Sequence, residues 1–179
     1  MVAYAITDPS TLDFNTLEKD LVNFCSKASM IVYRDKNTLE YASNAKKFLK
    51  YTHSFEQVLL HGDYILAKKL GADGVHLKST QFTDIQKAKD LELFVVISTH
   101  TLEEAKKAER LGADMLTYSP VFPTPNKSEA VGLSALKNVV ESVAIPVLAL
   151  GGMVTQVQID ACVAIGAEGF ASIRYFKKV

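Results

Sequence analysis

Short apolar segments alternate with amphipathic stretches along the chain. Eight apolar segments have the length and bounding turns of buried strands, and the stretches between them place apolar residues at helical spacing. In the first such stretch, Leu17, Leu21, Val22 and Cys25 share one helical face. The expected strands are 3–6, 30–34, 57–61, 74–77, 94–99, 115–119, 146–150 and 169–174.

A short motif recurs between these segments and predicts how they are joined. Leu-Gly-Ala-Asp occurs at 70–73 and at 111–114, and Ile-Gly-Ala-Glu at 165–168. Each copy predicts a helix that ends on an apolar residue, a glycine in the left-handed conformation, and then a buried strand. Eight strand-then-helix units in strict alternation favour a parallel (β/α)₈ TIM barrel over an open doubly wound sheet. We expect residues 1–179 to form a single domain.

The end of the chain departs from this alternation. Only five residues follow the eighth expected strand, which ends at 174 of 179 residues, so the eighth helix is missing or truncated. A missing helix should leave apolar barrel surface uncovered near both termini. We therefore expect a homo-oligomer in which a partner subunit covers that surface.

Composition and charge exclude several classes of partner. The chain is 48% hydrophobic and 22% charged, with a formal net charge of zero, so we expect no binding to nucleic acid. No apolar run approaches the roughly 18 residues of a membrane span, and the N-terminus has no basic leader. We expect a cytoplasmic protein that does not bind membranes. Cys25 and Cys162 are expected to be small buried hydrophobes.

Candidate chemistry gathers where the expected strands end. Barrel enzymes carry their active sites at the carboxyl ends of the strands. There, prolines stiffen the loop in 116–127, and the strand in 146–153 ends in Gly151 and Gly152, whose bare N–H groups at a helix N-terminus would suit phosphate. The cations expected at this rim are Arg34, Lys36, Lys78, Lys127 and Arg174. They predict a small-molecule substrate with one or two phosphates.

Five motifs carry a family resemblance over nearly the whole chain. They are Arg34-Asp35-Lys36, Gly74-Val75-His76-Leu77, the segment 98–104, Val-Phe-Pro-Thr-Pro-Asn-Lys at 121–127 and Ala-Leu-Gly-Gly-Met at 149–153. In these motifs the chain resembles the thiamine-phosphate synthase and TenI family of (β/α)₈ barrels. In that family, the synthase couples a pyrimidine pyrophosphate to a thiazole phosphate and releases pyrophosphate.

The resemblance implies a substrate site. It places Arg34, Lys36, Ser98, Thr124 and Lys127 at the pyrophosphate, and Gly152 with the Ile173–Arg174 turn at the thiazole phosphate. Asn126 and Gly151 are expected to bind substrate beside them. Arg174 stands where the synthases have a small hydroxyl residue, and it would either clamp phosphate or fill the pocket.

The metal site departs from the synthase pattern. The synthase holds magnesium with two aspartates, whose positions here are Gly62 and Gln81. Asp63, one residue after the first, is expected to cap a helix. Magnesium prefers carboxylate and phosphate oxygens. We therefore expect no metal and no cofactor, with Mg²⁺ required only if the chain is a synthase.

The TenI branch also lacks those aspartates, and its tautomerisation of a thiazole carboxylate phosphate needs a proton shuttle but no metal. Its histidine after the sixth strand is Pro120 here. His61, at the end of the third strand, could move the proton instead, with Arg34 and Lys127 as the other catalytic residues. His76 is expected to be a hydrogen-bonded core residue and His100 to orient a loop.

Three interpretations stay open. The first is a metal-independent, TenI-like thiazole tautomerase. The second is a thiamine-phosphate synthase with an altered magnesium site. The third is a phospholigand-binding protein without catalysis, because this chain matches the family's phosphate-binding residues better than any acid/base pair.

Overall fold

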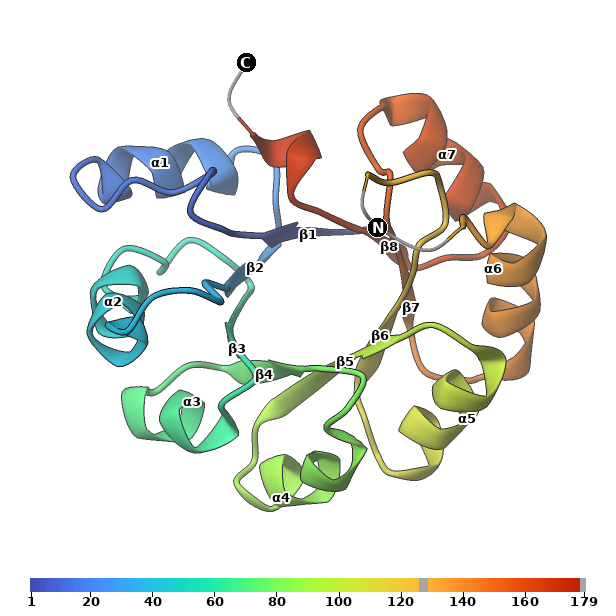
Figure 1. Cartoon of the computed structure of the whole chain (residues 1–179), viewed down its shortest axis with the longest axis horizontal. Coiled ribbons are helices and arrows are strands. Elements are labelled where there is room, and N and C mark those ends of the chain that lie inside the picture. Colours follow the sequence, from blue (N-terminus) through green and yellow to red (C-terminus); the bar gives the residue numbers. More distant parts are fainter. Residues whose placement is uncertain (126–128, 178–179) are drawn as a thin grey trace.

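Eight parallel strands form a closed barrel in sequence order, with β1 paired to β8, and helices surround it (Figure 1). The computed structural model describes residues 1–125 and 129–177. The strands are β1 (Val2–Ile6), β2 (Met30–Tyr33), β3 (Gln57–His61), β4 (Gly74–Leu77), β5 (Phe94–Thr99), β6 (Met115–Tyr118), β7 (Val147–Leu150) and β8 (Gly169–Ser172). The helices are α1 (Leu17–Cys25), α2 (Tyr41–Leu49), α3 (Tyr64–Leu70), α4 (Ile85–Asp90), α5 (Leu102–Arg110), α6 (Gly132–Ser142) and α7 (Gln156–Ala164). Two short 3₁₀ turns, η1 (Phe82–Asp84) and η2 (Arg174–Phe176), complete the described elements.

The fold confirms the expected TIM barrel. Three strands have the expected bounds, and the other five differ by one or two residues at an end. The largest difference is at β8, which was expected to end at 174 and ends at Ser172. There the Ser172 hydroxyl accepts a hydrogen bond from the Tyr175 amide, and the chain turns into η2.

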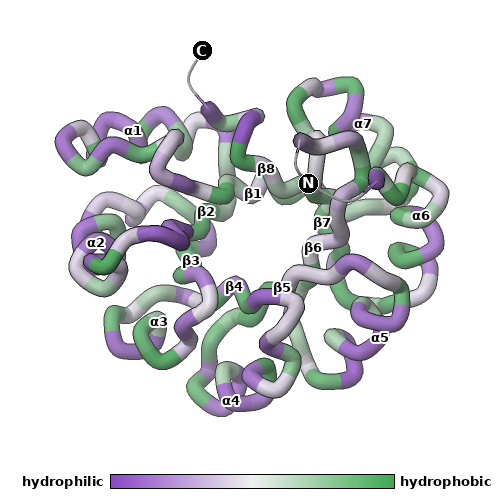
Figure 2. Tube along the Cα trace, viewed as in Figure 1, coloured by the Kyte–Doolittle hydropathy of each residue, from purple (hydrophilic) through white to green (hydrophobic). Residues whose placement is uncertain are grey.

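Apolar side chains pack in two layers. The inner layer fills the barrel with residues that include Tyr4, Val32 and Leu148, and the larger outer layer lies between strands and helices. The strands are almost wholly buried, whereas the helices alternate between apolar and hydrophilic positions (Figure 2). This arrangement is typical of a packed barrel, so the centre of the barrel is not a channel.

The recurring motif ends helices with a left-handed glycine, as predicted, and its aspartates also bond to neighbouring strands. Gly71, Gly112 and Gly166 follow helices with φ of 75°, 86° and 97°. In the first two copies the aspartate accepts a hydrogen bond from the strand before its own, at 2.7 Å from Asp73 to Val58 N and from Asp114 to Val95 N. The motif therefore helps to set the register of the barrel.

The C-terminal turn replaces the eighth helix. In η2, which lies between α1 and α7 (Figure 1), Phe176 stacks on Phe170 at 5.7 Å between ring centroids and approaches Phe24 at 6.2 Å. Phe170 is only 2% exposed and Phe176 6%. Phe176 of η2 therefore covers Phe170 of β8, so part of the apolar surface that a missing helix was expected to expose is buried. The homo-oligomer stays a prediction. No helix within the described residues is long and apolar enough to cross a membrane.

Candidate functional site

A cavity of about 760 Å³ opens at the carboxyl ends of the strands. It brings together all the expected site residues that the structure describes, which come from six different strand ends. They are Arg34, Lys36, His61, Ser98, Thr124, Gly151, Gly152, Ile173 and Arg174. Asn126 and Lys127 lie outside the described residues.

The cavity is strongly positive although the chain as a whole is neutral. Five cations line its described part, and Asp8 is the one carboxylate there. The cations are Arg34, Lys36, Lys78, Arg174 and Lys177. Such a mouth attracts and holds anions. Asp8 and Lys177 were not expected in the site: Asp8 follows β1 in a loop without a pattern, and Lys177 follows the truncated C-terminal turn.

One side of the cavity, here called the glycine side, is built from Gly151, Gly152, Ser172 and Arg174. Gly151 and Gly152 have φ of 94° and 71°. A Cβ atom on Gly152 would lie 2.5 Å from Phe122 Cβ, and one on Gly151 would lie 2.6 Å from Pro120 Cα. The glycines are therefore required by the close approach of the proline-rich loop after β6.

Backbone hydrogen bonds hold these two loops together. Val121 N donates to Leu150 O at 2.9 Å, and Phe122 N donates to Gly151 O at 3.0 Å. The expected helix N-terminus at the glycines was misplaced, since α7 begins at Gln156 after its N-cap Thr155. The amides of Gly151 and Gly152 donate to no described residue. They remain available to an anionic ligand.

The Ser172 hydroxyl joins β8 to the glycine loop. It donates to Met153 O at 2.7 Å and accepts from Tyr175 N at 3.1 Å. These bonds place Ile173 and Arg174 at the edge of the cavity. Arg174 is exposed and forms no ion pair within the described part of the chain, so it leaves the pocket open.

The opposite side of the cavity, here called the cationic side, consists of Arg34, Lys36 and Lys78 around His61. Burial, followed by repulsion from His76, Arg34, Lys78 and Lys36, lowers the pKa of His61 from 6.5 to about 3. The ring nitrogens of His61 bond to no described residue. His61 is therefore neutral near pH 7, and it is a weak base because its imidazolium form is disfavoured.

The other two histidines of the cavity have structural partners. His76 Nδ1 lies 3.0 Å from the Tyr4 hydroxyl and its Nε2 lies 3.0 Å from Ser98 Oγ. Burial lowers the pKa of His76 to about 3, which confirms a hydrogen-bonded core histidine. His100 Nδ1 lies 2.9 Å from Ser119 O and so donates to it, linking the ends of β5 and β6.

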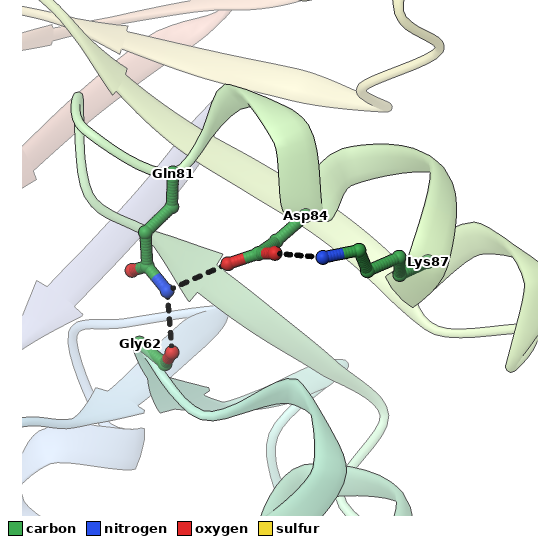
Figure 3. A network of polar contacts seen from close by, with 4 residues as sticks. All are labelled: Gly62, Gln81, Asp84 and Lys87. Carbon is green, nitrogen blue, oxygen red and sulfur yellow. Dashed lines mark hydrogen bonds and ion pairs between the residues drawn. The ribbon is translucent and has the colours of Figure 1, made fainter.

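At the positions that correspond to the two magnesium-binding aspartates of the synthases, the chain has a polar network that holds two loops together (Figure 3). Gln81 Nε2 donates to Gly62 O at 2.8 Å and to Asp84 Oδ2 at 3.2 Å, while Gln81 Oε1 accepts from Lys78 N at 3.1 Å. Asp84 also pairs with Lys87 at 3.0 Å. Both donors of the Gln81 amide are in use, so this side chain serves as a link between the β3 and β4 loops.

Carboxylates near the mouth hold their own loops. Asp63 Oδ1 accepts from Leu66 N at 2.8 Å and so caps α3, as expected. Asp8 Oδ1 accepts from Ser10 N, and Asp35 Oδ1 accepts from Asn37 N. Within the described residues, no group of three or more His, Cys, Asp or Glu side chains could hold a metal ion. Gly62 has no side chain and the Gln81 amide is already hydrogen-bonded, so neither position offers the carboxylate oxygen that Mg²⁺ prefers.

Comparison with known proteins gives a consistent family. The family described as thiamine monophosphate synthase matches residues 3–176. A thiamine-phosphate synthase of Clostridium acetobutylicum is 32% identical over 95% of this chain and 84% of its own length, and one of Caldivirga maquilingensis is 35% identical over 95% and 85%. Among solved structures, a thiamine phosphate pyrophosphorylase from Pyrococcus furiosus superposes with a TM-score of 0.82 at 30% identity, covering 96% of this chain and 85% of that one.

Proposed function

The chain belongs to the thiamine-phosphate synthase and TenI family, and from this membership we propose that it is a thiamine-phosphate synthase. It would couple a pyrimidine pyrophosphate to a thiazole phosphate and release pyrophosphate. The relatives named above are synthases, which favours this activity over the tautomerase that the missing aspartates first indicated.

The observation that supports the proposal is that one cavity has two different groups of anion-binding donors facing each other. The cationic side has three side-chain cations, whereas the glycine side has two backbone amides that donate to no described residue, beside Arg174. A reaction that joins two phosphorylated substrates needs both regions, with the reacting atoms held between them. A protein that binds a single phosphate needs only one.

Roles follow from this arrangement. Arg34 and Lys36 would bind the pyrophosphate, with Ser98 donating a hydrogen bond from β5. The Thr124 hydroxyl donates to Phe122 O at 3.1 Å here, so it would have to turn from this carbonyl to donate to the ligand. Gly151, Gly152, Ile173 and Arg174 would bind the thiazole phosphate. Asn126 and Lys127 lie outside the described residues, and the family resemblance assigns them to substrate binding, with Lys127 at the pyrophosphate. In the coupling, the thiazole nitrogen forms a bond to the pyrimidine's side-chain carbon, while the bond from that carbon to the pyrophosphate oxygen breaks. The leaving pyrophosphate takes the electron pair of the broken bond, so donors aimed at it lower the barrier.

A metal-independent thiazole tautomerase is the second candidate, because the residues at the expected metal site do not fit magnesium. Its weakness is the proton shuttle. Of the three histidines that line the described cavity, His61 is the one whose ring bonds to no described residue. Its pKa of about 3 makes it a poor base at neutral pH.

The test is a product assay on the purified protein. Pyrimidine pyrophosphate and thiazole phosphate are supplied together, and thiamine phosphate and pyrophosphate are quantified, in parallel reactions with EDTA and with Mg²⁺. Equal amounts of both products, lost in Arg34→Ala, support the synthase. Absence of product in both reactions overturns it.

The same preparation separates the alternatives. Aromatisation of the non-aromatic thiazole carboxylate phosphate in EDTA, lost in His61→Gln, would indicate the tautomerase. Tight binding of thiazole phosphate without either reaction would indicate a phospholigand-binding protein.

A further inference from the structure

We propose that the Lys78 ammonium occupies the place of a divalent metal ion in this chain and forms, with Arg34 and Lys36, a metal-independent pyrophosphate site. The inference deepens the proposed function and rests on it for the identity of the ligand. It concerns a residue at the end of β4, on the cationic side of the cavity.

The Lys78 side chain lies across the space beside Gly62. A Cβ atom on Gly62 would be 3.2 Å from Lys78 Cε and 3.6 Å from Lys78 Nζ. A side chain at residue 62 would therefore require the flexible end of Lys78 to shift slightly. Gly62 has φ of 79°, a conformation that glycine adopts readily. A glycine at this position makes room for the ammonium.

Gln81 fixes the backbone from which the Lys78 side chain extends. The Gln81 side chain accepts from Lys78 N at 3.1 Å, and Gln81 N donates to Lys78 O at 2.9 Å. The Gln81 amide also donates to Gly62 O at 2.8 Å (Figure 3), so one side chain joins the backbones of the glycine and the lysine. An aspartate at residue 81 could not donate to that carbonyl. Gly62, Lys78 and Gln81 thus form one consistent set that suits an ammonium and not a metal ion.

The charge of Lys78 is left for a ligand. No carboxylate in the described part of the chain forms an ion pair with it. Lys78 lines both the main cavity and an adjoining hollow of about 500 Å³, which it shares with Lys36 and His61. Its field is also felt by His61, whose pKa it helps to lower. Asp8 and Asp35 partly compensate Arg34, and Asp35 and Asp63 also line the adjoining hollow. In the main cavity Asp8 is the one carboxylate among the described lining residues, so the remaining positive charge there would attract an anionic ligand.

A pyrophosphate group fits this cluster by charge and by donors. An ammonium has three N–H donors and acts as a point charge, and a guanidinium such as that of Arg34 can bind two phosphate oxygens at once. No oxidant, reductant or additional co-reactant is involved, because Lys78 only stabilises the charge of the bound and departing pyrophosphate.

Calorimetric binding of inorganic pyrophosphate in EDTA tests the inference without any turnover. The wild type is expected to bind. Lys78→Met, which keeps the aliphatic stem and removes the charge, should raise Kd about tenfold to hundredfold, the range for a lost charge-assisted hydrogen bond. Lys78→Arg should retain most of the affinity. Lys69→Ala, which removes an exposed lysine on α3 outside both cavities, is the matched control and should bind as the wild type does.

Two results would overturn the inference: an unchanged Kd in folded Lys78→Met, or a wild-type affinity that appears only with Mg²⁺ or tightens tenfold or more when Mg²⁺ is added. Thermal unfolding of each variant establishes that it is folded. The outcome is distinguishable from that of the proposed function. Coupling that requires Mg²⁺ would support the synthase and contradict the role proposed for Lys78. Pyrophosphate binding that depends on Lys78 and persists in EDTA, without coupling, would support the role of Lys78 and contradict the synthase.

Discussion

The two sides of the cavity offer different means of binding the anions that we propose as ligands. On the glycine side, backbone amides are placed by glycines that a neighbouring loop touches, and a Cβ on Gly152 would lie 2.5 Å from Phe122. On the cationic side, three side chains supply the charge, and their positions depend on hydrogen bonds such as that from Gln81 to Gly62. A backbone site tolerates almost no substitution, whereas a side-chain site can exchange one kind of positive charge for another. This difference explains how the chain keeps its family's phosphate loop while its metal positions have changed.

The largest expected effect concerns the glycine side. Gly152→Val should lower the free energy of unfolding by about 3 kcal/mol or more, because the new Cβ overlaps Phe122 and φ of 71° is unfavourable for valine. Gly71→Ala is the matched control: its φ is 75° but its Cβ would meet nothing within 4 Å, so about 1 kcal/mol is expected. Urea denaturation measures both, and equal losses would mean that φ alone, and not loop contact, requires Gly152.

Lys127→Ala should weaken binding of a phosphorylated ligand by about 1.5–3 kcal/mol, the scale of a charge-assisted hydrogen bond. Calorimetry with pyrophosphate and with thiazole phosphate, measured separately, would show which side the lysine serves. Unchanged affinity for both ligands would remove Lys127 from the site.

Stability should fall as the pH is lowered from 7 to 5. His61 and His76 have folded pKa values of about 3, below the value of about 6.5 expected after unfolding, so in this interval the unfolded chain binds protons that the folded chain does not. For the fully buried His76 the loss is about 2 kcal/mol by pH 5. His61→Gln should show a smaller slope of unfolding free energy against pH. A flat profile in the wild type would contradict the lowered pKa values.

Ser172→Ala should have the smallest effect, a loss of about 1–2 kcal/mol in unfolding free energy, because one hydroxyl bonds both Met153 O and Tyr175 N. Ser26→Ala removes a single exposed bond to Asn23 O and should cost less. Thermal unfolding compares the two, and equal losses would mean that Ser172 does not tie η2 to the glycine loop.

Local patterns in the sequence determined the barrel. Strand bounds, the glycine after each recurring helix and the Asp63 cap depend on neighbours within a few residues, and apolar periodicity records them directly. The parallel alternation then placed the strand ends at one rim, which is why the nine described site residues that were expected there do meet in one cavity.

Tertiary structure alone decided the rest. Three features depend on contacts that no local pattern records. They are the position of the Lys78 side chain beside Gly62, the low pKa values of His61 and His76, and the burial of Phe170 by the C-terminal turn. A histidine looks alike in sequence whether its neighbours are carboxylates or cations, and a lysine looks alike whether it faces solvent or a glycine. Charge and packing act through distance in space, and only the closed barrel sets those distances.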